Sequence, residues 1–396
     1  MINFYSLLRL ICGLFIFLSQ FYIFESGSMQ PAHYLIVLVV IMFALRNNER
    51  IIAINSIARS MYLFLGYAAL INFYYSAYYW TLEFMEDNAF FLFNIIVFSV
   101  VFFLLKKSQK SHNFIFWTGF FGLFFIFMCW FIGVGRYNYA PRYSAFFNDP
   151  NQMALWVLCV SSVSILLAQS IVLRVTVICL AFSLVSLTLS RSGLLGLLPL
   201  LVGAITLILN KSAFRVSLWL AILLVPFFLY FTYLEFGGAF LDLVKRFDST
   251  DFYRQIQIRG YYRILEYPEY LIFGAGKGLD ARFGSEYEIH STWAGLLVYY
   301  GFIGLGLITR VLYKIQATLT TPEKILFASP LAYGFATYGF RTPIFWVFLA
   351  VFSYVAVRRS RSSVQDLLSN GHLLTSSPEP RVCLKPYGYS DGKSLR

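Results

Sequence analysis

The sequence is dominated by apolar runs of roughly 17–22 residues, the length that an α-helix needs to cross a hydrocarbon core about 30 Å thick. These runs recur along most of the chain, and short polar segments separate them. Hydrophobic residues make up 59% of the chain and charged residues only 13%, against about 25% charged in a soluble domain. A transmembrane β-barrel is excluded because its strands alternate in polarity over about ten residues. The pattern predicts an all-α, polytopic membrane protein.

We expect about twelve transmembrane helices, with both termini on the same side of the membrane. The predicted spans are residues 4–24, 31–45, 57–76, 89–105, 113–134, 151–171, 173–189, 194–210, 213–234, 291–312, 324–340 and 343–357. They form one predicted domain, residues 1–359, in which a large polar loop at about residues 235–290 precedes the tenth span. Residues 360–396 lack apolar periodicity and are predicted to form a disordered tail.

Lysine and arginine gather in the connections on the side of the N-terminus, and the positive-inside rule makes that side cytoplasmic. The residues on this side are Arg46, Arg50, Lys106, Lys107, Lys110, Arg174, Lys211, Arg215, Lys314, Lys324, Arg358, Arg359 and Arg361. The tail of residues 360–396 is therefore predicted to be cytoplasmic, and the large loop to lie on the outer side.

Several cations lie on the outer side, against this preference. Two short outer connections carry Arg136, Arg142 and Arg191, and the large loop carries more. The cations of the large loop are Lys245, Arg246, Arg254, Arg259, Arg263, Lys277 and Arg282. An anionic ligand on the outer face explains arginines retained there. The alternatives are that a loop near sixty residues translocates with little regard to charge, and that Arg191 extends to lipid headgroups.

Two motifs fit an anionic ligand. Asp149-Pro150-Asn151 predicts the start of a helix, where free backbone N–H groups attract anions. The alternative is a loop that only caps its helix. Arg259 and Arg263 are four residues apart, so on a helix they share a face and can bind two phosphoryl oxygens.

Residues 274–278, Gly-Ala-Gly-Lys-Gly, lack the spacing of a nucleotide-binding loop, and on the outer side they lie away from cellular nucleotides. We expect a turn with positive φ there, and a backbone nest for phosphate is the alternative. His290 lies where the large loop re-enters the membrane and can remove a proton from a hydroxyl group. An ordinary interfacial histidine is the alternative. No Cys/His/Asp cluster has metal-ligand spacing, so no metal or other cofactor is expected.

Together these segments resemble the O-antigen polymerase and O-antigen ligase family of bacterial inner-membrane glycosyltransferases. The likeness covers roughly residues 136–310. It rests on residues 142–151, on Ser190-Arg191-Ser192-Gly193, and on the large loop with Arg259, its Gly-x-Gly turn and His290-Ser291. The family usually has asparagine where Ser291 stands, and glycine is common at the position of Ala145.

The resemblance implies transfer of a glycan from undecaprenyl pyrophosphate to a sugar hydroxyl, in the periplasm and without metal or nucleotide sugar. Polymerisation of surface-polysaccharide repeats is the favoured reaction, and ligation to the lipid A core is the alternative. His290 and Arg259 are the catalytic candidates, and the pyrophosphate-binding candidates are Arg142, Arg191, Arg263 and Asn151. The expected partners are the lipid-linked donor, a lipid-linked repeat or lipid A core as acceptor, the bilayer and a chain-length regulator, with no nucleic acid.

A transporter or flippase of lipid-linked sugars is the rival from another class. Transporters place ionisable residues or broken helices near the middle of the bilayer. The cations described above lie instead at the predicted outer ends of spans. A non-catalytic membrane scaffold is a third interpretation, and it predicts that Arg259 and His290 can be replaced without loss of function.

Overall fold

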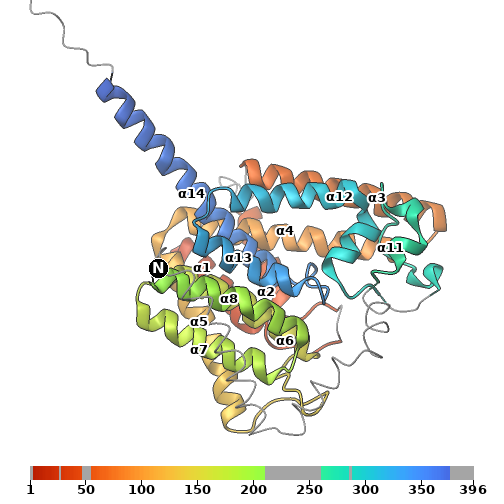
Figure 1. Cartoon of the computed structure of the whole chain (residues 1–396), viewed down its shortest axis with the longest axis horizontal. Helices are drawn as coiled ribbons and strands as arrows, with labels where there is room; N and C mark the ends of the chain where they lie inside the picture. Colours follow the sequence, from red (N-terminus) through yellow and green to blue (C-terminus); the bar gives the residue numbers. More distant parts are fainter. Residues whose placement is uncertain (1–2, 26–27, 47–54, 210–259, 285–287, 375–396) are drawn as a thin grey trace, which may run out of the picture.

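The computed structural model describes residues 3–25, 28–46, 55–209, 260–284 and 288–374, and every regular element in these ranges is a helix (Figure 1). The long helices are α1 (Phe4–Leu18), α2 (Pro31–Ala44), α3 (Ser56–Tyr79), α4 (Glu83–Lys107), α5 (Gln109–Phe131), α6 (Pro150–Leu167), α7 (Ile171–Leu187), α8 (Arg191–Leu209), α12 (Thr292–Gln316), α13 (Thr321–Tyr333) and α14 (Pro343–Leu374). Within the described residues between α8 and α12 there are three short helices: α11 (Arg263–Glu266), η2 (Pro268–Tyr270) and η3 (Asp280–Phe283). The predicted all-helical class is confirmed for these residues. The predicted span at 213–234 and residue Arg259 lie outside them.

Six of the described helices are long and apolar enough to cross a membrane. They are α4, α5, α6, α8, α12 and the Pro343–Arg361 part of α14, whereas α1, α2 and α7 are shorter apolar helices. The protein is therefore a helical membrane protein. The first helix ends at Leu18, earlier than the predicted span 4–24. The chain turns away there because Tyr22 donates its N–H to Phe146 O in the α5–α6 connection, at 3.0 Å.

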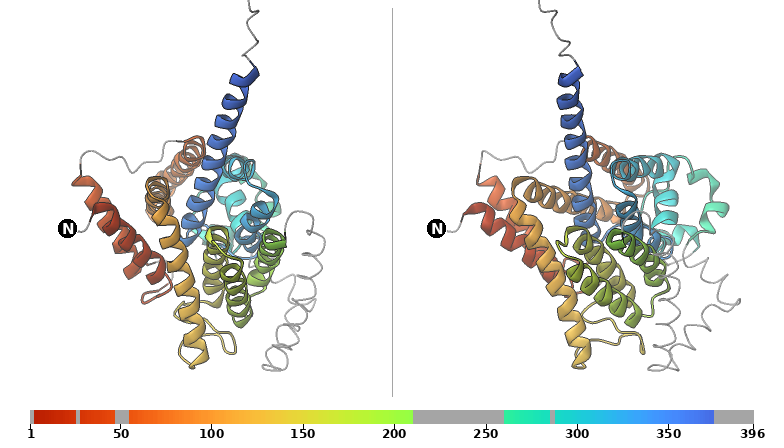
Figure 2. Two further views of the ribbon diagram at one scale, coloured as in Figure 1. Left: turned by 90° about the vertical axis from the view of Figure 1, so that its left-hand side faces the viewer. Right: turned by 60° about the vertical axis from the view of Figure 1, so that its left-hand side comes forward.

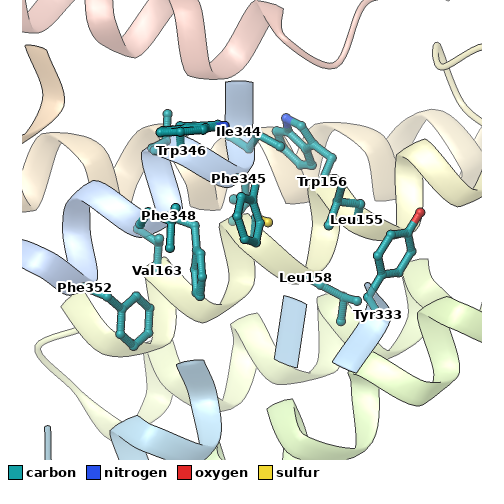
Figure 3. Packing of buried hydrophobic residues seen from close by; sticks show 14 of the residues in the cluster. Leu155, Trp156, Leu158, Val163, Tyr333, Ile344, Phe345, Trp346, Phe348 and Phe352 are labelled. Atoms are coloured by element: carbon teal, nitrogen blue, oxygen red, sulfur yellow. The ribbon is translucent and has the colours of Figure 1, made fainter. Parts of the chain in front are cut away.

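Helix α6 lies at the centre of the bundle and packs against α5, α7, α8, α13 and α14. Figure 3 shows the contact region, where aromatic and branched side chains of α6, α13 and α14 fill the space between the helices. The labelled residues are Leu155, Trp156, Leu158, Val163, Tyr333, Ile344, Phe345, Trp346, Phe348 and Phe352. By contrast, α5 exposes Phe121, Phe124 and Phe131. Such an apolar outer surface is suited to contact with lipid. Within lipid, close packing of side chains, as around α6, holds the helices together.

Polar contacts gather at both ends of the bundle. At one end, Lys314 Nζ of α12 donates to Ser60 Oγ of α3 at 2.8 Å, and Arg359 of α14 pairs with Glu323 of α13. At the other end lie the α5–α6 and α7–α8 connections and the starts of α12 and α14. The hydroxyl of Thr337, before α14, donates to Ser192 Oγ of α8 at 2.8 Å. The predicted outer arginines 142 and 191 belong to this second end.

Helix α14 is longer than the predicted span 343–357 and projects from the bundle (Figures 1 and 2). Residues 360–374, which belong to the predicted tail 360–396, continue this helix. Residues 358–370 contain no glycine or proline. A helix already formed in the bundle can therefore propagate through them at little cost. Residues 375–396 lie outside the described part of the chain.

Candidate functional site

A cavity of about 870 Å³ lies at the second polar end of the bundle, within the size range of small-molecule sites. Four predicted site residues from distant parts of the sequence line it: Arg142, Asn151, Arg191 and His290. Arg142 comes from the α5–α6 connection, Asn151 and Arg191 from the first turns of α6 and α8, and His290 from the segment before α12. The structure thus joins the short outer connections to the end of the large loop.

The α5–α6 connection folds back on itself and presents Arg142 to the cavity. Arg136 and Ala145 pair through their backbones, with Arg136 N donating to Ala145 O at 2.7 Å. Tyr143 is buried, and its hydroxyl donates to Val134 O at 2.7 Å. Ala145 has φ of 50°, in the left-handed region that favours glycine. These contacts fix the backbone on both sides of Arg142.

The guanidinium of Arg142 is held by two neighbouring elements. Its Nε donates to Thr188 O in the α7–α8 turn at 3.0 Å, and its Nη2 donates to Asn151 Oδ1 at 3.0 Å. Ser190 Oγ also donates to Asn151 Oδ1, at 2.7 Å. Arg142 and Asn151 therefore form one connected group, and Asn151 orients the arginine.

Four helices begin beside the cavity, at Pro150, Arg191, Thr292 and Pro343. The predicted cap of α6 is confirmed: Asp149 accepts from Asn151 N at 2.5 Å, and Pro150 occupies the first turn. Ser190 stands in the corresponding place before α8, where its Oγ accepts from Gly193 N at 3.1 Å. Helix N-termini carry partial positive charge, so these starts add to the field of the arginines and favour an anion.

His290 lies between two anchored residues. Ile289 N donates to the Tyr299 hydroxyl at 3.2 Å, and Ser291 Oγ accepts from Ala294 N at 3.3 Å, which caps α12. Ser291 Oγ also forms a hydrogen bond with the Tyr261 hydroxyl, at 2.8 Å. His290 itself is exposed and lines the cavity. The backbone is thus held while the imidazole faces the space where a ligand fits.

Sequence reasoning missed a group of four charged residues beside His290. Lys277 Nζ contacts Asp87 Oδ1 at 2.9 Å and Glu288 Oε1 at 3.3 Å. Arg341 Nη2 donates to Glu288 Oε2 at 2.8 Å, and its Nη1 lies 3.7 Å from Asp87 Oδ1. Arg341 and Glu288 both line the cavity. Arg341 stands between the predicted spans 324–340 and 343–357, so the signal that selected Arg191, an arginine in a short outer connection, also applied to it.

The two cations control the ionisation of Glu288. Burial raises the pKa of this carboxyl group, but the attraction of Lys277 and Arg341 lowers it by more, so its pKa lies below the ordinary value. Burial lowers the pKa of Arg341, whereas Glu288 and Asp87 raise it, and the net shift is upward. Both shifts favour the charged forms of Glu288 and Arg341.

Arg263 is not brought to this cavity. Its guanidinium is buried, with Nη1 2.5 Å from Asp280 Oδ1, and it lies over the Phe283 ring. The Tyr299 hydroxyl donates to the same carboxylate oxygen at 2.8 Å. We therefore leave Arg263 out of the proposed site, because the protein itself supplies its counterion. Arg259, the predicted catalytic arginine, lies outside the described residues.

Arg282 is also occupied within the loop. Its Nη2 donates to Ala275 O and Gly276 O, both at 2.6 Å, and its guanidinium lies within 5 Å of the ring centroids of Phe84 and Phe283. Burial lowers the pKa of Arg282. Arg263, Lys277 and Arg282, the loop cations within the described residues, thus serve the packing of the loop onto the bundle.

The glycine-rich segment forms the predicted turn and does not form an anion nest. Gly274 has φ of 90° and Gly276 has φ of 66°. The N–H groups of residues 274–277 donate to Tyr270 O, Val298 O, Tyr299 O and Asn72 Oδ1 at 2.7, 2.9, 2.8 and 3.0 Å. A phosphate would have to displace these bonds. The turn instead fastens the loop to α12 and delivers Lys277 to Asp87.

Neither a protein-family model nor a curated protein matches this chain. In the described part of the chain, no group of three or more His, Cys, Asp or Glu residues is placed to hold a metal ion. Function therefore has to follow from the cavity, which combines arginines, helix N-termini and an exposed imidazole. Such a site can bind an anionic group and accept a proton beside it.

Proposed function

We propose that this protein is a glycosyltransferase that moves a glycan from undecaprenyl pyrophosphate to a sugar hydroxyl. The observation that carries the proposal is the meeting of Arg142, Arg191 and His290 in one cavity at the end of an apolar bundle. A pyrophosphate is the anion that a polyprenyl-linked donor brings to the membrane surface. The resemblance to the O-antigen polymerase and ligase family points to the same donor.

In this reaction the acceptor hydroxyl oxygen attacks the anomeric carbon of the donor sugar. The bond between that carbon and the phosphate oxygen breaks, and its electron pair leaves with undecaprenyl pyrophosphate. The hydroxyl proton passes to His290, which acts as the general base. Negative charge grows on the departing pyrophosphate, where Arg142 and Arg191 stabilise it. Arg259 remains a predicted second catalytic residue, and Asn151 contributes by orienting Arg142.

The proposal includes the place of the protein in the cell. We place it in the bacterial inner membrane, with about twelve spans, a cytoplasmic C-terminus and the cavity on the periplasmic side. Exposed Ile23 and Phe24 border the cavity and offer an apolar path for the polyprenyl chain. Ala145 supports the family resemblance, since glycine is common at this position in the family and Ala145 adopts a φ that glycine favours.

Deletion of the gene, followed by gel analysis of surface polysaccharide, tests this function. Loss of long chains, with a single repeat kept on the lipid A core, identifies a polymerase. A bare core with long lipid-linked chains accumulating identifies a ligase. Complementation with His290→Ala should fail although the variant reaches the membrane. Unchanged polysaccharide in the deletion strain, or full rescue by His290→Ala, would refute the proposed chemistry.

A further inference from the structure

Arg341 occupies the short connection between α13 and α14 and lines the large cavity together with Arg142, Arg191 and His290. We infer that Arg341 is a further donor-binding residue, whose guanidinium contacts the pyrophosphate. This inference rests on the proposed function and adds a residue that neither the sequence motifs nor the family resemblance indicated. It also explains why an arginine is retained at this end of the bundle.

The position of Arg341 is fixed by contacts with two other elements and with Tyr338 of its own connection. Asn94 Nδ2 of α4 donates to Arg341 O at 2.8 Å, which holds the backbone. Nη2 donates to Glu288 Oε2 at 2.8 Å. The rings of Phe90 and Tyr338 lie 5.6 and 5.7 Å from the guanidinium carbon. A side chain held in this way loses little conformational freedom when a ligand binds.

The guanidinium still has donors to offer. Arginine carries five N–H groups, and the hydrogen bond to Glu288 uses one of them. The 3.7 Å contact between Nη1 and Asp87 Oδ1 is an ion pair longer than a hydrogen bond. The side chain is 23% exposed. Arg341 can therefore keep Glu288 and present further N–H groups to a phosphoryl oxygen.

Lys277 makes this sharing possible. It contacts the same two carboxylates, Asp87 and Glu288, and its side chain is only 6% exposed. When Arg341 donates hydrogen bonds to a ligand, Lys277 still forms ion pairs with both Asp87 and Glu288. No buried carboxylate is left without a cation, which would be costly in this setting. Asp87, Glu288 and Lys277 therefore hold Arg341 in position beside the cavity.

The inference can be tested by binding, separately from catalysis. The full-length protein in detergent is titrated with farnesyl pyrophosphate, with farnesol as the ligand that lacks the anion. Arg341→Gln should weaken binding of farnesyl pyrophosphate about ten- to hundredfold, the range for a lost charged hydrogen bond. Farnesol binding should not change. Arg310→Gln, which removes an exposed arginine of α12 outside the cavity lining, is the control for net charge.

Arg341→Lys guards against a folding defect, because it keeps a cation for Glu288 and Asp87 and loses only the planar fork. It should weaken farnesyl pyrophosphate binding about tenfold at an unchanged unfolding temperature. Wild-type affinity in a folded Arg341→Lys or Arg341→Gln variant, while Arg142→Gln binds weakly, overturns the role of Arg341 alone. Equal affinity of the unsubstituted protein for farnesyl pyrophosphate and farnesol overturns both this role and the proposed function.

Discussion

The cations at the cavity end of the bundle fall into two groups with different surroundings. In the segment 260–284, Arg263, Lys277 and Arg282 bind carboxylates, carbonyls and aromatic rings of the protein itself. In the short connections, Arg142, Arg191 and Arg341 line a cavity of about 870 Å³. Both groups break the charge preference predicted for the outer side. Only the second group lines this cavity.

The difference shows that the presence of an arginine on the outer side does not by itself indicate a ligand, and that its surroundings in the fold have to be known as well. The large loop supplies Asp280 and Glu288 close to its own cations, so the chain can fold its charges together. The connection that carries Arg341 has no acid of its own, and Arg341 pairs with Glu288 and Asp87 of other elements. The length of a segment and its content of acids therefore matter as much as its number of cations.

The largest expected effect is the loss of protein stability when a cation of the first group loses its partner. Asp280→Ala leaves the buried Arg263 without its carboxylate, and breaking a buried ion pair typically costs about 3–5 kcal/mol. We expect the free energy of unfolding, measured by denaturant titration in detergent, to fall by this amount. The double variant Asp280→Ala/Arg263→Met should recover much of the loss. A change below about 1 kcal/mol in the single variant would contradict the structural role of Arg263.

The next effect is on catalysis by the second group. Arg142→Lys keeps the charge but loses the donors that contact Thr188 and Asn151, so the leaving pyrophosphate is poorly stabilised. We expect the transfer rate to fall about 10²–10³-fold, as for the loss of one oriented donor. Arg136→Lys is the matched control: it changes an exposed arginine of the same connection that is outside the cavity lining. Equal rates in both variants would remove Arg142 from the site.

A smaller effect is expected at Ser190, which both caps α8 and helps to orient Asn151. Ser190→Ala removes a helix cap and the hydrogen bond to Asn151, so it should lower the free energy of unfolding by about 1 kcal/mol and also weaken donor binding. Ser170 accepts from Leu173 N at the start of α7 and is away from the cavity lining. Ser170→Ala should therefore reduce stability alone. Binding losses of the same size in both variants would refute the orienting role.

The smallest effect concerns pH. The pKa of Glu288 lies below its ordinary value of 4.5, so the ionised carboxylate stabilises the folded protein at neutral pH. This contribution is complete above the unfolded pKa and is lost as pH falls through the folded pKa. Unfolding curves of the protein and of Glu288→Gln should therefore differ at pH 7 and converge as the pH falls through the lowered pKa of the folded state. A difference that persists or grows in acid would contradict this assignment.

The helical class followed from run lengths alone, because only helices and closed barrels satisfy the backbone in lipid. Helix boundaries depended on tertiary contacts. Helix α1 ends early because Tyr22 pairs with Phe146, and α14 runs on to Leu374. No glycine or proline in the sequence predicts the early end of α1 or the extension of α14 beyond residue 357. The length of a helix that leaves the bundle is set by local propensity and not by the membrane.

The site was accessible from sequence where local chemistry was enough. The Asp149 cap and the arginines of short connections carried visible signals, and the structure brings Arg142 and Arg191 to one cavity. The pairing of Arg263 with Asp280 had no signal in the sequence, because the two residues meet only after the loop packs. The link between Lys277 and Asp87 joins residues that no spacing rule relates. Counterions of this kind appear only in three dimensions.

The central claim is that the protein transfers a glycan at this cavity, and a reconstituted reaction tests this claim most directly. The protein in liposomes is given a labelled repeat unit on undecaprenyl pyrophosphate, and the products are separated by chain length. We predict longer lipid-linked glycans with release of undecaprenyl pyrophosphate, and loss of both products in His290→Ala. Movement of the labelled lipid across the bilayer without any new glycosidic bond would contradict the claim and identify a transporter.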